Sequence, residues 1–186
     1  ELVCTVPFPS KPIGFWGDLN HQKYLSAYFE GFPGVWTHGD FASVSKTGGF
    51  TLFGRSDATL NSKGVRIGTA EIYRVVETFP QIQECMAVSQ DWDNDTRVVL
   101  FIVLKDGQQL DEVATKEIKK ALRDQASPRH VPDKIIVAPE LPRTKSNKLV
   151  ELAVTDVING REVRNLDALA NPKALEWFKN LPDLLK

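Results

Sequence analysis

The chain is organised around residues 54–72, which read Gly-Arg-Ser-Asp-Ala-Thr-Leu-Asn-Ser-Lys-Gly-Val-Arg-Ile-Gly-Thr-Ala-Glu-Ile. Two arginines stand eleven residues apart in this stretch, Arg55 beside Asp57 and Arg66 between Gly64 and Gly68. Glycines that flank a cation are typical of a tight turn that presents charge. The sequence before the stretch resembles the end of one domain, and the sequence after it resembles a small complete domain.

The bulk composition excludes several classes of protein. With 42% hydrophobic and 25% charged residues in 186, the chain has a soluble globular composition. A net charge of -1 disfavours nucleic acid as a partner, and no run approaches the roughly 20 apolar residues of a membrane span. Cys4 and Cys85 suggest neither a disulfide framework nor a zinc site, which favours a reducing, cytoplasmic location. Because the chain starts at Glu1 rather than Met, we expect a fragment.

Residues 1–40 combine prolines with aromatic side chains. Prolines fix the backbone and remove donors, so this segment is expected to be loop around aromatic anchors, with one short helix at 22–29. Such a segment cannot bury its aromatic rings on itself. We expect it to pack on a larger body that this chain lacks.

The pattern from residue 44 onward predicts an α+β fold. Turn residues at 45–49 lead into a strand at 50–53, and a second hairpin joins 58–61 to 65–67 across 62–64. Thr69 is the expected N-cap of a helix that ends before Pro80. The remaining expected elements are strands at 84–90 and 97–104 joined by 91–95, a helix with an apolar face from Val113 to Gln125, a strand at 134–138 and a helix at 149–158 that closes at Asn159-Gly160.

This order suggests three parts. Residues 1–56 are expected to be the end of a large domain, residues 57–158 a small α+β domain, and residues 159–186 a C-terminal extension without legible chemistry. Residues 116–148 carry nine Lys or Arg against four Asp or Glu, which suggests a phosphate-bearing ligand, although a solvated cationic face explains the same excess.

Four motifs resemble the later signature motifs of the adenylate-forming enzymes, the family of acyl-CoA synthetases, adenylation domains and luciferases. In chain order they are Thr-His-Gly-Asp at 37–40, Gly-Arg-Ser-Asp at 54–57, Gly-Val-Arg-Ile-Gly-Thr-Ala-Glu-Ile at 64–72 and Pro-Arg-Thr-Lys-Ser-Asn-Lys at 142–148. The resemblance implies that the small domain has a ferredoxin-like sheet with helices. It also implies a ligase that uses ATP, CoA and Mg²⁺, with the acyl pocket and the phosphate loop on a large N-terminal domain missing from this chain.

The flanking segments resemble a narrower group within that family. Residues 1–18 and the tail around 150–154 and 169–172 are similar to the members that activate acetoacetate. Members that activate acetate or propionate share the core motifs and remain an alternative, since the acyl pocket is absent from these residues. A stand-alone interaction module is a second alternative, against which the aromatic residues of 8–36 argue, because they would form a large apolar patch without a partner.

The resemblance also implies roles for individual residues. Asp40 would hold the ribose hydroxyls of ATP, Arg55 would contact ribose or phosphate, and Arg66 would face the adenylate. Asp57 would be the hinge about which the small domain turns. Lys148 would neutralise charge on the α-phosphate during adenylation.

The remaining assignments concern CoA and the departures from the family pattern. Gly64 would keep the backbone small where pantetheine passes, and Arg123 would bind a CoA phosphate, although a helical arginine is more often solvated. Asn147 stands where the family usually has Gly, and Asn tolerates the positive φ of that turn. Tyr73 is expected to be a helix-surface change of little chemical meaning. The three histidines show no metal spacing, so no metal ligands are expected in this chain.

Overall fold

The chain divides between Asp57 and Ala58 into two units, Glu1–Asp57 and Ala58–Lys186. The computed structural model describes residues 1–62, 64–163 and 166–186, so Lys63 in the expected turn at 62–64 lies outside the described residues. Among the described residues, no helix is long and apolar enough to cross a membrane.

The first unit contains two antiparallel strand pairs and one helix. Strand β1 (Val3–Cys4) pairs with β2 (Trp36–Thr37), β3 (Asp40–Val44) pairs with β4 (Phe50–Arg55), and α1 spans Gln22–Phe29. The turn between β3 and β4 is closed by the Ser45 hydroxyl, which accepts the Gly49 N–H at 2.9 Å. The expected helix and first hairpin are therefore confirmed.

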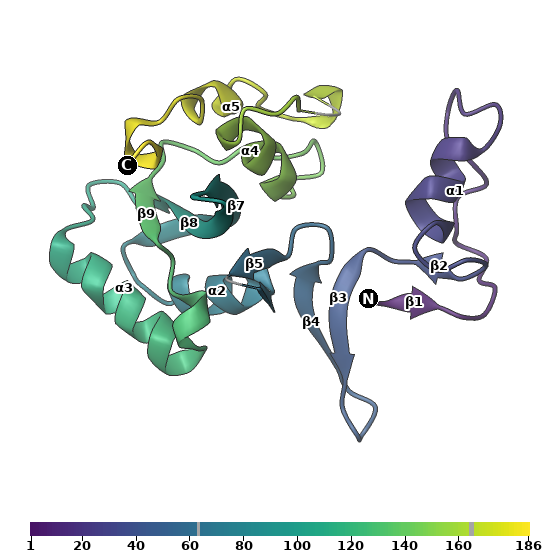
Figure 1. The fold of residues 1–186 in the computed structure, drawn as a ribbon, viewed down its shortest axis with the longest axis horizontal. Coiled ribbons are helices and arrows are strands. Elements are labelled where there is room, and N and C mark those ends of the chain that lie inside the picture. The colour runs from purple at the N-terminus through teal and green to yellow at the C-terminus, as the bar shows by residue number, and fades with distance from the viewer. Residues whose placement is uncertain (63, 164–165) are drawn as a thin grey trace. The chain divides into compact units, whose positions relative to one another are not determined.

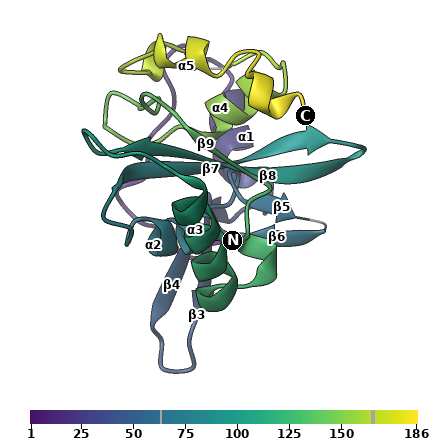
Figure 2. The same cartoon turned by 90° about the vertical axis from the view of Figure 1, so that its left-hand side faces the viewer.

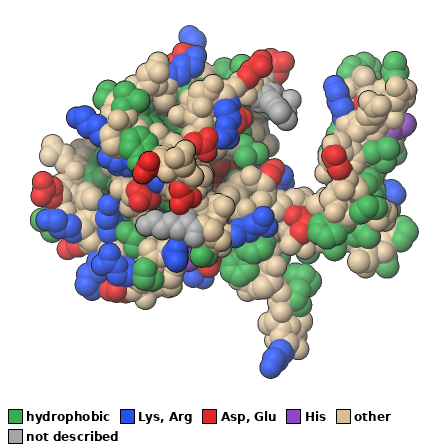
Figure 3. Space-filling view, viewed as in Figure 1, with side chains coloured by type: hydrophobic (Ala, Val, Ile, Leu, Met, Phe, Trp, Pro, Cys, Tyr) green, Lys and Arg blue, Asp and Glu red, His purple; other side chains and the backbone are tan. Residues whose placement is uncertain are grey.

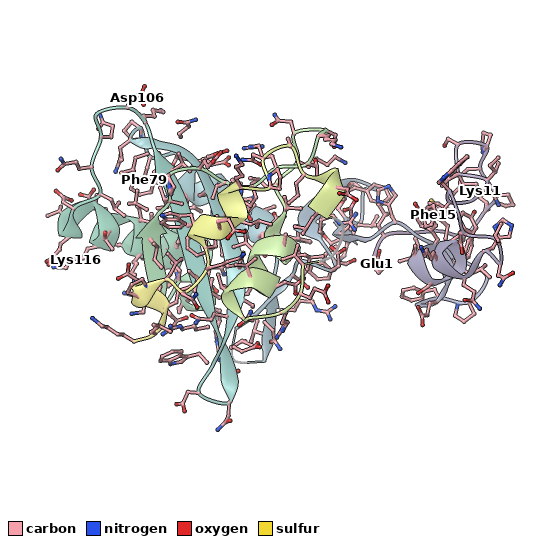
Figure 4. The ribbon with its side chains drawn as sticks, turned by 90° about the horizontal axis from the view of Figure 1, so that it is seen from above. Glu1, Lys11, Phe15, Phe79, Asp106 and Lys116 are labelled. Carbon is pink, nitrogen blue, oxygen red and sulfur yellow. The ribbon has the colours of Figure 1, made fainter. Side chains whose placement is uncertain are left out.

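Aromatic rings, rather than a buried core, organise the first unit. The Trp36 ring stacks on Tyr28 at a centroid distance of 3.8 Å and meets Phe8 edge-on at 5.3 Å. Phe15 lies beside α1, as Figure 4 shows, 5.8 Å from the Tyr24 ring. All of residues 1–57 are described, and none of them is buried. Several large apolar side chains are fully exposed, including Ile13 at 99% and Trp16 at 102%.

The second unit has a three-layer arrangement around a three-stranded sheet. The central β8 (Asp95–Leu104) pairs antiparallel with β7 (Ile82–Trp92) and parallel with β9 (Lys134–Val137). Helices α2 (Thr69–Val76) and α3 (Glu112–Gln125) cover one face, and α4 (Glu151–Ile158) and α5 (Ala174–Trp177) cover the other (Figures 1 and 2). A separate hairpin joins β5 (Leu60–Ser62) to β6 (Val65–Ile67). The α+β class is confirmed.

Strand β8 explains why both faces of the sheet must be covered. Its apolar run sends alternate side chains to opposite faces, as the period of a strand requires. Val99, Phe101 and Val103 belong to the core under α4 and α5, whereas Val98, Leu100 and Ile102 belong to the core under α2 and α3. A strand without a polar face needs a helical layer on each side.

Several expected boundaries are wrong, each for a local reason. Gly68, not Thr69, is the N-cap of α2, because the Gly68 carbonyl accepts the first helical bond, from the Glu71 N–H at 3.1 Å. The β7–β8 connection is a two-residue turn, since Asp93 and Asn94 both adopt positive φ, at 50° and 59°, and the strands extend further than expected. Val113 is 62% exposed because only the inner part of the α3 face reaches the core.

The last residues are part of the second unit. Leu169, Leu175, Phe178, Leu181 and Leu184 are buried in the same core as Phe101 and Val154. The sequence-based division set 159–186 apart as an extension, whereas the compact unit runs to Lys186. The tail is mostly polar, and these five apolar positions are what join it to the core of the second unit.

A buried arginine ties the end of the tail to the sheet. Arg97, 8% exposed on β8, donates to the carbonyls of Leu184 at 2.7 Å and Lys186 at 2.9 Å. It also donates to Gln90 at 2.8 Å and lies 3.6 Å from the centroid of the Trp92 ring. The guanidinium thus has carbonyl, amide and aromatic partners, as a buried cation requires.

Candidate functional site

Arg55 and Asp57 form a two-bond ion pair at the end of the first unit. Arg55 closes β4 and donates from Nε to Asp57 Oδ1 at 3.1 Å and from Nη2 to Oδ2 at 2.8 Å. This fork geometry is the strong form of the interaction, and the hydrogen bond to Asp57 raises the pKa of the Arg55 guanidinium. The proposed hinge residue, at the boundary of the two units, is therefore held by the strand that precedes it.

Asp40 lies in the same charge cluster. Strand pairing places Asp40 opposite Arg55, and the His38 Nδ1 lies 2.7 Å from the Asp40 Oδ2. Gly39, with φ of 86°, lies under the guanidinium, where a Cβ would come within 3.0 Å of the Arg55 Nη2. The structure thus brings together three expected site residues of the first unit, Asp40, Arg55 and Asp57, and gives Gly39 a steric reason to be glycine.

Gly64 and Arg66 lie on the β5–β6 hairpin of the second unit. Gly64 has φ of 79°, and no heavy atom lies within 4 Å of its added Cβ, so backbone conformation rather than crowding requires glycine there. Arg66 is exposed on β6, opposite Asn61. Helix α2 begins at Thr69, three residues after Arg66, and its Glu71 carboxylate accepts the Gly68 N–H at 3.2 Å and lies 3.3 Å from the His130 Nε2. The hairpin therefore leads into a firmly capped helix.

Lys148 lies on a short, hydrogen-bonded turn. The Thr144 N–H donates to the Lys148 carbonyl at 2.8 Å, and the Lys148 N–H donates to the Thr144 hydroxyl at 3.0 Å. Asn147 adopts φ of 63°, so Asn in place of Gly preserves the expected left-handed residue. The Lys148 side chain is exposed, and no carboxylate in the described part of the chain forms an ion pair with it. Its ammonium charge is thus available to an external group.

Arg143 braces the same turn from the side of the sheet. Its guanidinium pairs with Glu84 on β7 and donates to the Asn147 carbonyl at 2.8 Å. Arg143 is therefore a structural cation of the motif, while Lys148 at the other end of the turn keeps its charge unpaired. The helix α4 begins at Glu151, so the lysine precedes the helix rather than starting it.

Arg123 lies on the exposed face of α3, in the last turn of the helix. A cation at this position is favourable with the helix dipole, which accounts for it without a ligand. Lys and Arg side chains around α3 are interleaved with acidic ones in Figure 3, and Lys116 points outward from the helix in Figure 4. The geometry does not favour Arg123 over its neighbours as a phosphate ligand.

Tyr73 is a packing residue, so the expectation of a surface change was wrong. Its hydroxyl accepts the Ala87 N–H of β7 and donates to the Glu151 carboxylate of α4, both at 3.1 Å. Burial is the main cause that raises the pKa of Tyr73 well above its ordinary value. Tyr73 thus connects α2, β7 and α4, and its position three residues before the buried Val76, on the same side of the helix, was the available signal.

No metal centre is evident in residues 1–62, 64–163 and 166–186, and one of the two free thiols, Cys85, is buried. No group of three or more His, Cys, Asp or Glu side chains in these ranges could hold a metal ion. Cys85 is buried, and burial raises the pKa of its thiol far above the ordinary value. Lys148 and the charged residues of each unit remain the candidate site residues among those that the structure describes.

Comparisons with known proteins agree with this geometry. Residues 71–148 match the family described as AMP-binding enzyme C-terminal domain. The chain is 56% identical over 184 residues to an acetoacetyl-coenzyme A synthetase of Rhizobium meliloti, covering 99% of this chain and 28% of that protein. The chain belongs to the adenylate-forming enzymes. An acetoacetyl-CoA synthetase of Xenopus tropicalis is 46% identical, with the same shares covered.

A solved structure extends the agreement to three dimensions. The acetoacetyl-CoA synthetase from Streptomyces lividans matches with a TM-score of 0.87 at 36% identity, over 95% of this chain and 27% of that one. The expected family and fold are confirmed. Because the chain spans about 28% of the length of the curated relatives, it corresponds to a part of an adenylate-forming enzyme.

Proposed function

We propose that this chain is the mobile C-terminal part of an ATP-dependent acid–thiol ligase that makes acetoacetyl-CoA from acetoacetate, ATP and CoA. The observation that carries the proposal is Lys148, an exposed cation with no ion-pair partner among the described residues, on a hydrogen-bonded turn within the matched family domain. The named relatives are acetoacetyl-CoA synthetases, which favours acetoacetate over acetate or propionate as the acid.

Lys148 serves the first half-reaction. The acetoacetate carboxylate attacks the α-phosphorus of ATP, a P–O bond forms, and pyrophosphate leaves with the electrons of the broken bond. Negative charge gathers on the oxygens of the α-phosphate in the transition state, and a fixed ammonium group stabilises it. In the second half-reaction the CoA sulfur attacks the acyl carbon, and AMP leaves.

The other residues are assigned to nucleotide, hinge and CoA. Asp40 accepts hydrogen bonds from the ribose, Arg55 contacts ribose or phosphate, and Arg66 faces the adenylate. Asp57 is the hinge, because the division between the two units falls directly after it. Rotation there would withdraw Lys148 and bring in the hairpin of Gly64.

CoA and Mg²⁺ complete the proposed set of ligands. Arg123 is proposed to bind a CoA phosphate while Gly64 lets pantetheine pass. Mg²⁺ would arrive with the ATP phosphates, since the described residues offer no cluster of metal ligands of their own. The missing partner is the N-terminal domain of the same enzyme, against which the exposed apolar side chains of the first unit would pack. A cytoplasmic location is proposed from the two free cysteines.

A comparison of two lysines tests the proposal. In the full-length enzyme, Lys148→Ala should lower acetoacetate-dependent ATP–pyrophosphate exchange by about 100-fold or more, the size seen when an oxyanion-stabilising group is removed. Formation of acetoacetyl-CoA from supplied acetoacetyl-adenylate should be spared. Lys145→Ala removes an exposed lysine of the same turn and should leave both rates near wild type. Equal loss of both half-reactions in Lys148→Ala would overturn the role.

The isolated chain provides a second test. Without the domain that would bind acetoacetate and ATP, residues 1–186 should show no pyrophosphate exchange. Clear turnover would contradict the proposal that these sites lie on the N-terminal domain. Substrate profiling of the full-length enzyme should rank acetoacetate above acetate and propionate. The opposite ranking would replace acetoacetate as the proposed acid while leaving the ligase chemistry in place.

A further inference from the structure

Tail residues 168–171 run alongside the turn that carries Lys148. An antiparallel bridge joins Thr144 to Leu169, and a second one joins Arg143 to Leu149 across the turn. Two backbone hydrogen bonds extend the first bridge, from the Lys145 N–H to the Ala168 carbonyl at 3.0 Å and from the Ala170 N–H to the Arg143 carbonyl at 2.8 Å. The outgoing strand of the turn therefore lies between its own return strand and a strand supplied by the tail.

The side chain of Asn171 completes this arrangement. Its Oδ1 accepts the Arg143 N–H at 2.8 Å, and its Nδ2 donates to the Glu140 carboxylate at 2.9 Å and to the Leu141 carbonyl at 3.1 Å. One amide group thus uses both its acceptor and its donors on the segment that leads into the turn. Asn171 touches the base of the turn and does not contact Lys148.

The tail is itself anchored in the core, so it can hold the turn in place. Leu169 is 6% exposed and packs in the cluster of Phe101 and Val154, and Leu175 and Phe178 follow it into the same core. By contrast, residues 145–148 are exposed, and none of them has a buried side chain as an anchor. The position of the turn therefore depends on hydrogen bonds, and the tail supplies those on one side.

We propose that Asn171 is a positioning residue for Lys148, and that residues 168–171 act as an added strand that fixes the lysine turn for adenylation. The inference rests on the proposed role of Lys148 in adenylation and extends it to a residue outside the family domain at 71–148. A displacement of about 1 Å at a reacting group can cost about 100-fold in rate, so loosening the base of the turn should impair the step that needs the ammonium.

The chain offers a matched control in Asn159. Its side chain also makes three hydrogen bonds, accepting from the Asp91 N–H at 2.7 Å and donating to the carbonyls of Ser89 at 3.1 Å and Thr155 at 2.8 Å. Asn159 is the C-cap of α4, and none of these three hydrogen bonds is made to the lysine turn. Asn159→Ala therefore removes the same chemistry from the same unit without touching the turn.

The experiment uses the full-length enzyme and two readouts. The first is hydrogen exchange of the amides of residues 144–148, and the second is the pair of half-reaction rates. Asn171→Ala should speed exchange at the turn by about 10-fold or more and lower pyrophosphate exchange by about 10- to 100-fold. Thioester formation from supplied acetoacetyl-adenylate should stay within about twofold of wild type. Asn159→Ala should leave the turn amides and the ratio of the two rates unchanged.

A rescue variant separates positioning from general loss of stability. Asn171→Asp keeps the acceptor for the Arg143 N–H but sets a second carboxylate against Glu140, so it should impair adenylation at least as much as Asn171→Ala. Adding Glu140→Gln removes the second carboxylate and supplies an amide donor at position 140, whereas the Leu141 carbonyl remains without its donor. Pyrophosphate exchange should then recover in part, to a rate clearly above that of Asn171→Asp alone.

Three results would overturn the inference. The first is hydrogen exchange of the turn amides that is unchanged in Asn171→Ala. The second is an equal fall in the rates of both half-reactions in that variant. The third is failure of Glu140→Gln to rescue Asn171→Asp. Failure of the proposed function is distinguishable from failure of this inference. If Lys148 has no role in adenylation, Lys148→Ala will leave pyrophosphate exchange intact. Hydrogen exchange of the turn amides will still report whether Asn171 holds the turn in place. In that case the catalytic part of the inference is refuted as well.

Discussion

The two units of this chain differ in how they hold their functional side chains. In residues 1–57 none of the side chains is buried, and the charges of Asp40, Arg55 and Asp57 are joined to one another or to His38 at the surface. In residues 58–186 two apolar clusters enclose the sheet, and Lys148 stands on a turn tied to that frame. The first unit thus leaves its aromatic and other apolar side chains at least partly exposed, whereas the second has its own core.

The largest expected effect comes from the core of the second unit. Phe101 is fully buried on β8, and its ring meets Phe178 at 4.9 Å. Phe101→Ala should lower the free energy of unfolding of residues 58–186 by about 3–5 kcal/mol, measured by urea denaturation. Trp36→Ala, in the aromatic cluster of the first unit, should leave that transition unchanged. A similar loss from both would remove the distinction between the units.

The buried arginine of the tail should rank second. Arg97→Ala would leave Gln90 and two tail carbonyls without their donor, at an expected cost of about 2–3 kcal/mol. The same urea transition measures this cost, and Arg97→Lys should recover part of it. A change below about 0.5 kcal/mol, the size typical of ordinary surface substitutions, would show that the tail does not contribute to the stability of the unit.

Two buried groups of the second unit should make its stability depend on pH. The pKa values of Cys85 and Tyr73 are raised in the folded state, so the folded protein keeps protons that the unfolded chain has lost. Stability is therefore complete below the unfolded values of about 8.5 and 10 and falls above them, by up to about 1.4 kcal/mol per pH unit for each group.

Two variants should show which part of this fall in stability comes from Cys85 and which part comes from Tyr73. Cys85→Ala should move the onset of the fall from about pH 8.5 to about pH 10, and Tyr73→Phe should then flatten the remaining slope. Urea denaturation at several pH values between about 8 and 11 measures both. Stability that rises through this range would contradict the raised pKa values of the two groups.

The smallest effect is expected at the junction. Arg55 and Asp57 form a well-aligned but half-exposed pair, which solvent screens, so Arg55→Ala should change stability by less than about 1 kcal/mol. The change should instead appear in activity, because Arg55 is proposed to contact the nucleotide. A large loss of stability with normal pyrophosphate exchange would make this pair structural only.

Much of the fold was predictable from the sequence, because local patterns determine it. The strand at 97–104, the helix that ends at Gln125 and the Asn159-Gly160 stop signal all have local causes, and the structure bears them out. The motif residues were found because their order along the chain is distinctive. Long-range partners were not predictable, since nothing near Asn171 indicates that it meets Arg143, and nothing in the tail indicates that Arg97 binds its carbonyls.

We expect the turn that presents Lys148 to be as well fixed as the core behind it. Hydrogen exchange of the backbone amides of Thr144, Asn147 and Lys148 in residues 1–186 tests this directly. We predict slow exchange at these amides, approaching that of the β8 amides and slower than at the amides of residues 1–57. Exchange at the turn as fast as in the first unit would contradict the claim, because the ammonium group would then have no fixed position from which to act.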